Sequence, residues 1–246
     1  MDQVQDVLNS VLFPDKFPPP DTSKTEAARK VHNAMWADAY NRNLRLEHVE
    51  VEVRLGRAPE SGRGPFNTNV PERMFRTFAT ALQSYTDWDG TGYDKQIVGY
   101  FPQIDESLRL VVNADGSRRL ISKQKAMHAD FLCPGSPLDI RLAVSVELPV
   151  TEPMATLDKA TRTVVRERHS YSLNSFRYDL TSMQHADGSR EFQVEIELID
   201  PPAAQVTLGG TAQKLTLELQ NRLLDLFRMC EDTSTLVIKP LRKRYF

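Results

Sequence analysis

Two segments far apart in the chain repeat one alternation of apolar and acidic residues. Residues 48–56 read HVEVEVRLG, and residues 192–200 read FQVEIELID. In an extended strand, successive side chains point to opposite faces, so a period of two separates the two kinds of residue. Each segment is therefore predicted to be a strand with one apolar face and one face of glutamates.

The same period of two recurs through the middle of the chain. Turn signals such as Ala114-Asp115-Gly116 and Ala186-Asp187-Gly188 separate the alternating segments. Eight antiparallel strands of this kind can close into a barrel. We expect an α+β fold that is mainly β: a closed eight-stranded antiparallel β-barrel with a polar, ionic interior and supporting helices outside. The expected strands are residues 48–54, 96–101, 107–112, 120–127, 139–148, 162–169, 175–181 and 191–198.

Apolar residues at helical spacing predict three helices outside the barrel. The first is expected at about residues 23–42, and the third at about residues 211–230. The second is expected to begin at Asn69-Val70-Pro71. Residues 1–22 contain a proline run at 18–20 and are expected to form an N-terminal segment and linker, with 23–246 as one domain. The basic run 242–244 is interpreted as a solvated tail, with a nuclear address as the alternative.

Composition excludes several classes of function. A net charge of −2 argues against binding nucleic acid through bulk positive charge. No apolar run approaches the ~18 residues that a membrane span needs. Cys133 and Cys230 have neither metal-ligand spacing nor a Cys-x₅-Arg phosphatase loop, so reduced thiols in an intracellular protein are expected.

The strand positions in phase with the glutamates are mainly ionic, and the opposite phase is apolar. A single alternating strand ordinarily turns its polar face to water. Here, however, acidic and basic residues are grouped by strand instead of being mixed for cross-strand pairing, which favours a polar face inside the barrel. The in-phase residues include Arg109, Lys123, Lys125, Arg141, Ser145, Glu147, Arg166, Arg168, Arg177, Asp179, Thr181, Glu195 and Glu197.

Paired carboxylates on one strand face need positive charge nearby. Side chains at i and i+2 stand ~7 Å apart, and two carboxylates at that distance repel by about 2 kcal/mol at an effective dielectric constant near 20. A divalent cation or the opposing arginines can offset this repulsion. Carboxylate oxygens without His or Cys suit Mg²⁺ or Mn²⁺, and the basic strands suit a phosphate chain.

The order of these motifs resembles one enzyme family. Glu50-x-Glu52-x-Arg54 comes first, Arg166-x-Arg168 and Arg177-x-Asp179-x-Thr181 follow, and Glu195-x-Glu197 comes last. Over about residues 46–200 the chain resembles the triphosphate tunnel metalloenzymes. It is most similar to the fungal and protozoan (trypanosomatid-type) mRNA 5′-triphosphatases, which begin cap synthesis.

The resemblance implies a role for each matching residue. Glu147 and Glu195 would hold the attacking water, and the two acidic strands are expected to face each other across the interior and share a cation. Gln193 replaces a third glutamate of the fungal enzymes and is expected to be structural. The implied metal ligands are Glu50, Glu52 and Glu197. The implied catalytic residues are Glu147, Glu195, Arg109, Arg166, Arg168 and Asp179. The implied substrate-binding residues are Arg109, Lys123, Lys125, Arg141, Arg166, Arg168 and Arg177, and the choice between Lys123 and Lys125 stays open.

The function implied is a metal-dependent polynucleotide 5′-phosphatase that uses Mg²⁺ or Mn²⁺. It would release the γ-phosphate of triphosphate-ended pre-mRNA and hydrolyse NTPs with Mn²⁺, as a nuclear monomer that works with an RNA guanylyltransferase and no membrane. One alternative is a tripolyphosphatase or thiamine triphosphatase of the same fold, whose first strand usually carries Lys where this chain has Arg54. Another is a non-catalytic barrel that binds phosphorylated ligands.

Overall fold

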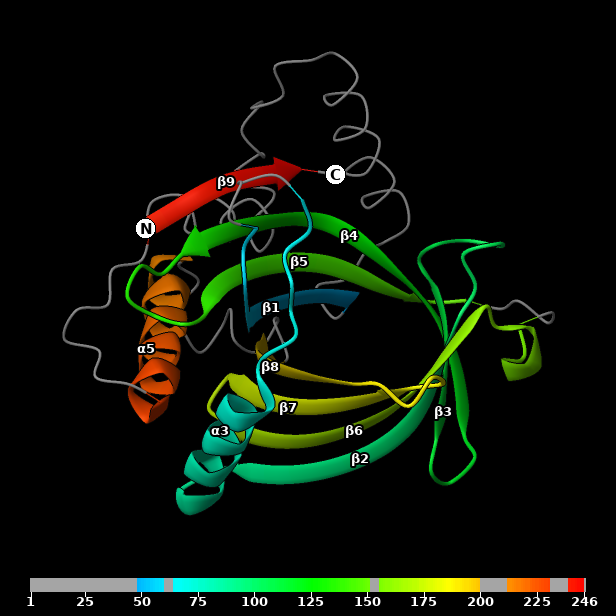
Figure 1. Cartoon of the computed structure of the whole chain (residues 1–246), viewed down its shortest axis with the longest axis horizontal. Coiled ribbons are helices and arrows are strands. Elements are labelled where there is room, and N and C mark those ends of the chain that lie inside the picture. The colour runs from blue at the N-terminus through cyan, green and yellow to red at the C-terminus, as the bar shows by residue number, and fades with distance from the viewer. Residues whose placement is uncertain (1–47, 60–63, 151–154, 200–211, 231–238, 246) are drawn as a thin grey trace, which may run out of the picture.

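The strands form one sheet that closes on itself (Figure 1). The computed structural model of the chain describes residues 48–59, 64–150, 155–199, 212–230 and 239–245. Around the barrel the strand order is β3-β2-β6-β7-β8-β1-β5-β4, and a β3–β4 pairing closes the ring. The predicted eight-stranded antiparallel barrel is therefore confirmed. The barrel strands are β1 (Val49–Gly56), β2 (Gly90–Tyr100), β3 (Leu108–Asn113), β4 (Arg118–Leu132), β5 (Asp139–Pro149), β6 (Arg162–Leu173), β7 (Phe176–His185) and β8 (Arg190–Leu198).

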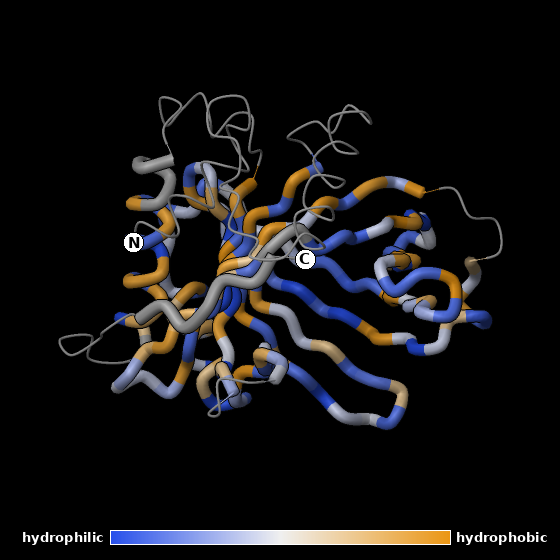
Figure 2. Tube along the Cα trace, turned by 90° about the horizontal axis from the view of Figure 1, so that it is seen from above, coloured by the Kyte–Doolittle hydropathy of each residue, from blue (hydrophilic) through white to orange (hydrophobic). Residues whose placement is uncertain are grey.

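The apolar face of the barrel wall is turned outward and covered by two helices. These are α3 (Glu72–Ser84) and α5 (Ala212–Cys230), which lie on the same side of the barrel in Figure 1. The strand residues Val53, Leu180 and Ile196 are 2% exposed or less and share one core with Phe78 of α3 and Leu226 of α5. Figure 2 shows hydrophilic and hydrophobic residues interspersed along the strands, as this two-faced wall requires. Burying one such side chain contributes roughly 1.5–3 kcal/mol, so the outer core fixes the direction of the inner face.

A second, smaller apolar cluster lies at another part of the wall. The short 3₁₀ helix η2 (Leu157–Lys159) packs there against Phe101, Leu108 and Leu110, which are all buried. No helix of the part that the structure describes is long and apolar enough to cross a membrane.

The pairing of β1 with β8 corrects one expectation. The two strands do not face each other across the interior: they are hydrogen-bonded neighbours, with Glu52 directly opposite Glu197 and Arg54 opposite Glu195. Residues directly opposite on antiparallel strands point to the same face of a sheet. The glutamates of both strands therefore form a single acidic wall.

Two strand assignments also differ from the prediction. Strand β2 begins at Gly90, because its first half pairs with β6 from Gly90↔Ser172 onward. The basic C-terminal run, interpreted as a solvated tail, lies in β9 (Lys239–Tyr245), which pairs with the second half of β4. Strand β4 is longer than β3, so this half would otherwise present an open edge. The expected helix at 23–42 lies outside the described residues.

Candidate active site

The barrel encloses a cavity of about 890 Å³ lined by side chains from all eight strands. That volume lies in the range of sites for small molecules, but the lining is mainly ionic instead of apolar. The acidic lining residues are Glu50, Glu52, Asp94, Glu147, Glu191, Glu195 and Glu197, and the basic ones are Arg54, Arg109, Arg119, Lys123, Arg162, Arg166, Arg168 and Arg177.

On the acidic wall, three carboxylates surround the Lys123 ammonium. Lys123 Nζ lies 3.7 Å from Glu52 Oε2 and 3.6 Å from Glu147 Oε1, and it donates a hydrogen bond to Glu50. Ser145 Oγ donates to Glu50 Oε2 at 3.0 Å. These groups converge because β5 lies beside both β1 and β4 in the barrel order. The sequence left Lys123 and Lys125 open as alternatives, and Lys123 is the one that lines the cavity.

The carboxylates of this wall experience different electrostatic environments. Burial raises the pKa of Glu50; Lys123 opposes this rise, and Glu147 and Glu52 add to it. Burial also acts to raise the pKa of Glu52, but Arg54 and Lys123 outweigh it and hold that pKa below its usual value. Burial raises the pKa of Glu197 to about 7 despite the attraction of Arg177. For Glu50 and Glu197, burial therefore disfavours the charged carboxylate more strongly than the neighbouring bases favour it.

Arg54 connects Glu52 of β1 with Glu195 of β8. Its Nη2 donates to Glu52 Oε2 at 2.9 Å, and its Nε forms an ion pair with Glu195 Oε1 at 2.7 Å. Burial acts to lower the pKa of Arg54, but Glu195 and Glu52 outweigh this and raise it. Arg54 is therefore a fixed positive charge that orients two of the glutamates.

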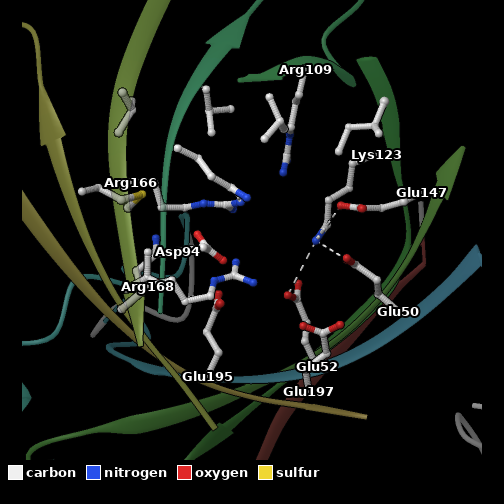
Figure 3. A pocket seen from close by; sticks show the side chains of 18 of the residues that line it. Glu50, Glu52, Asp94, Arg109, Lys123, Glu147, Arg166, Arg168, Glu195 and Glu197 are labelled. Carbon is white, nitrogen blue, oxygen red and sulfur yellow. Dashed lines mark hydrogen bonds and ion pairs between the residues drawn. The ribbon is translucent and has the colours of Figure 1, made fainter. Parts of the chain in front are cut away.

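Arg166 and Arg168 of β6 lie across the cavity from the cluster around Lys123, with Asp94 beside them, and Arg109 of β3 lies between the two sides (Figure 3). The Nε atoms of Arg109, Arg166 and Arg168 are buried and make no hydrogen bond. Burial, reinforced by Arg168, lowers the pKa of Arg166, which donates its Nη2 hydrogen to Gln96. Buried donors without acceptors are costly, so this side of the cavity is suited to an anion that accepts several hydrogen bonds.

Asp179 lies behind the arginines and does not line the cavity. It is 1% exposed and accepts hydrogen bonds from Arg177 Nε at 2.9 and 3.0 Å and from Ser170 Oγ at 2.6 Å. It also forms an ion pair with Arg168 Nη1 at 3.2 Å. Arg177 in turn donates to Glu197 at 2.5 Å. Asp179 is placed to hold two arginines in position, not to contact a ligand.

Two residues that the resemblance assigned to substrate binding lie outside the cavity lining. Arg141 is directly opposite Arg54 in register, but its guanidinium binds Asp130 at 2.6 and 2.9 Å and lies over the Phe66 ring. Lys125 is exposed. The other predicted residues, apart from Asp179 behind the wall, are brought together around one cavity.

Several residues that line the cavity carry little signal in the sequence. Asp94 lies in the first half of β2, which carries no apolar alternation, and Gln96 begins the predicted strand 96–101 without a charge that would mark it as a site residue. Gln193, expected to be structural, does line the cavity and also donates from Nε2 to Thr68 Oγ1 at 3.1 Å. Tyr100 and Arg119 also line the cavity, and their only sequence signal was their phase with Asp94 and Lys123 on their own strands. Arg162 shares the phase of Arg166 and was interpreted from the sequence as solvated, but it lines the cavity too.

The acidic wall has the donor chemistry of a magnesium or manganese site. Within the described ranges, no three Asp, Glu, His or Cys side chains already enclose a metal position. Three carboxylates nevertheless converge on one positive charge, Lys123, and Glu197 lies directly opposite Glu52. Hard oxygen ligands of this number suit Mg²⁺ or Mn²⁺, so the residues present fit such an ion.

A closed barrel with carboxylates on one side and arginines on the other is the architecture of a triphosphate tunnel. The chain belongs to the family described as mRNA capping enzyme, beta chain, which matches residues 60–229.

Individual relatives agree with this family. The chain is 29% identical over 191 residues to the mRNA-capping enzyme subunit beta of Cryptococcus neoformans var. neoformans serotype D. This match covers 75% of the chain and 44% of the relative, so the chain spans less than half of that protein. Among solved structures, the S. pombe Pct1 RNA triphosphatase matches with a TM-score of 0.63 at 17% identity, covering 85% of this chain and 94% of Pct1. Pct1 in complex with the Spt5 CTD matches with a TM-score of 0.62 at 20% identity, over 84% of this chain and 94% of the other. These two likenesses support the fold.

Proposed function

We propose that this protein is a metal-dependent RNA 5′-triphosphatase, which releases the γ-phosphate from triphosphate-ended RNA. The observation that carries the proposal is the division of one cavity into a carboxylate wall and an arginine wall. Family membership supports it, as does the printed name of Pct1 as an RNA triphosphatase.

In this proposal the arginine wall binds the phosphate chain. Arg109, Arg166 and Arg168 donate to the phosphate oxygens and stabilise the charge that develops on them during transfer. A planar guanidinium can bind two oxygens at once, which a lysine cannot. Asp179 keeps Arg168 and Arg177 in place, so little reorganisation is needed when the ligand binds.

The acidic wall would hold the metal and the attacking water. Glu50, Glu52 and Glu197 are the proposed ligands of Mg²⁺ or Mn²⁺, which would supply Lewis-acid stabilisation of the γ-phosphate. Glu195 lies beside Arg168 (Figure 3), so we assign it the proton of the attacking water, and Glu147 orients that water. The water oxygen forms a bond to the γ-phosphorus as the bond to the bridging oxygen breaks, leaving a diphosphate RNA end.

The proposed function also implies surrogate substrates and a partner enzyme. NTPs would serve as surrogate substrates with Mn²⁺, because they carry the same triphosphate. A guanylyltransferase would use the diphosphate end next, and we propose that both reactions take place in the nucleus. The Spt5 CTD is a ligand of Pct1, and no role for it in this protein is proposed.

The test is phosphate release from a panel of substrates by the purified protein. Triphosphate-ended RNA, ATP and tripolyphosphate are each incubated with Mg²⁺, with Mn²⁺ and with neither. We expect one phosphate to be released from RNA only when a metal is present. Hydrolysis of tripolyphosphate alone would assign the protein to the tripolyphosphatases instead, and binding of all three without hydrolysis would indicate a non-catalytic barrel.

A further inference from the structure

One section of the cavity lining is apolar, unlike the ionic remainder. Val98 of β2 lies directly opposite Val111 of β3 and Val164 of β6, and all three are 3% exposed or less. Each also lines the cavity. A phosphate chain gains nothing from three valines, so this section is suited to another part of a ligand.

An aromatic ring flanked by two arginines borders this section. Tyr100 lies opposite Arg109 on one neighbouring strand and opposite Arg162 on the other. The guanidinium carbon of Arg162 is 4.3 Å from the ring centroid, and that of Arg109 is 5.6 Å away. Within the described part of the chain, Arg162 forms no ion pair with a carboxylate, in contrast to Arg168 and Arg177. Its charge, and the face of its planar group that is turned away from Tyr100, are therefore available to a ligand.

Arg109 and Arg166 lie between the Tyr100 ring and the acidic wall. Arg109 contacts Tyr100 and is also within electrostatic range of Glu52. Arg166 is within range of both Tyr100 and Glu195. A triphosphate whose terminal phosphate lies at the carboxylates would extend past these two arginines. The group attached to its other end would then reach Tyr100.

We infer that Tyr100, Arg162 and the section formed by Val98, Val111 and Val164 bind the first nucleoside of the substrate. The inference rests on the proposed RNA 5′-triphosphatase function and names the part of the substrate that these residues recognise. Bases stack on tyrosine rings and on arginine guanidinium planes, and the apolar face of a base or the carbon atoms of a ribose can lie against the valines. Stacking is tolerant of sequence because every base has a π-face, so any first nucleotide is accepted. The subsite distinguishes a triphosphate on a nucleoside from inorganic tripolyphosphate.

The experiment compares kcat/KM for a short triphosphate-ended RNA, ATP and tripolyphosphate at one metal concentration. Tyr100→Ala should lower the RNA-to-tripolyphosphate ratio by about tenfold or more, from the loss of one stacked base. The ATP-to-tripolyphosphate ratio should fall in parallel. Tyr100→Phe keeps the ring and should keep the ratio. The matched control is Tyr93→Ala on the same strand, because Tyr93 is 58% exposed and does not line the cavity.

A second variant addresses folding. If thermal unfolding shows that Tyr100→Ala is not folded, Arg162→Gln is tested in its place, because Arg162 is exposed and its substitution should not disturb the fold. Arg162→Gln should lower the RNA-to-tripolyphosphate ratio several-fold by raising KM for RNA. If the folded variant loses activity equally on all three substrates, Tyr100 only positions Arg109 and the inference is overturned. If the parent protein hydrolyses tripolyphosphate but neither RNA nor ATP, the proposed function itself has failed, and this inference fails with it.

Discussion

At the scale of single residues, the glutamates of the acidic wall repel one another, and three basic residues offset this repulsion. Glu52 and Glu197 are directly opposite each other, an arrangement that is destabilising in a sheet. Lys123 and Arg54 compensate Glu52, and Arg177 compensates Glu197. The wall is therefore arranged for ligand binding at some cost in stability.

Removing one of these charges should separate function from stability. Glu197→Gln removes a carboxylate that burial and Glu50 disfavour in its charged form, and Arg177 keeps Asp179 as a partner, so the metal-free variant should unfold at the same temperature as the parent or a higher one. In the proposed site it also removes a metal ligand, so the rise in melting temperature that Mn²⁺ produces should shrink. Thermal unfolding with and without Mn²⁺ measures both effects. An equal Mn²⁺ shift in parent and variant would exclude Glu197 as a ligand.

Removing the charge of Asp179, in contrast to that of Glu197, should lower the stability of the fold. Asp179→Asn removes the buried carboxylate that pairs with both Arg168 and Arg177 and leaves Arg177 with Glu197 alone, which should lower the free energy of unfolding by about 3 kcal/mol. Denaturant unfolding measures this loss. The control is Glu167→Gln, which breaks an exposed ion pair with Lys95 that water screens, so the stability should change little. Similar losses in the two variants would mean that Asp179 is not the brace described above.

At the scale of elements, local periodicity predicted the strands with an apolar face but not their neighbours. The first half of β2 reads GTGYDK and is mostly exposed, so it has no alternation to detect, and Asp94 was missed with it. The side-by-side placement of β1 and β8 depends on pairing between distant segments, which no local pattern encodes. Arg141 has the inward phase, but its ion pair with Asp130 on β4 keeps it out of the cavity lining.

The end of β1 provides a test of packing at the element scale. A Cβ at Gly56 would lie 2.2 Å from the Asn67 backbone oxygen and 2.4 Å from Phe66 Cε1, where β1 ends against the segment that leads to α3. Gly56→Ala should therefore lower the free energy of unfolding by about 2 kcal/mol or more. Gly90→Ala is the control, because a Cβ there meets nothing within 4 Å. A Gly56→Ala protein as stable as the Gly90→Ala protein would contradict the close approach.

At the scale of the whole molecule, the net charge is −2, and the arginines proposed to bind phosphate line the cavity of the barrel. RNA should then be recognised at its triphosphate and first nucleoside, without a long contact along its backbone. Each further phosphate neutralised on a single strand would add about −0.7 to the slope of log affinity against log salt. We expect nearly the same slope for a short and a long triphosphate RNA, measured by equilibrium binding. A slope that steepens with RNA length would reveal a backbone-binding surface outside the barrel.

The central claim is that the inward carboxylates carry out phosphate release from RNA. The most direct measurement is the rate of γ-phosphate release from triphosphate-ended RNA with Mn²⁺ by two matched variants, Glu52→Gln inside the barrel and Glu167→Gln outside it. We predict that Glu52→Gln slows release by about 100-fold or more while the protein stays folded, and that Glu167→Gln releases phosphate at the parent rate. A folded Glu52→Gln protein that hydrolyses RNA as fast as the Glu167→Gln protein would contradict the account.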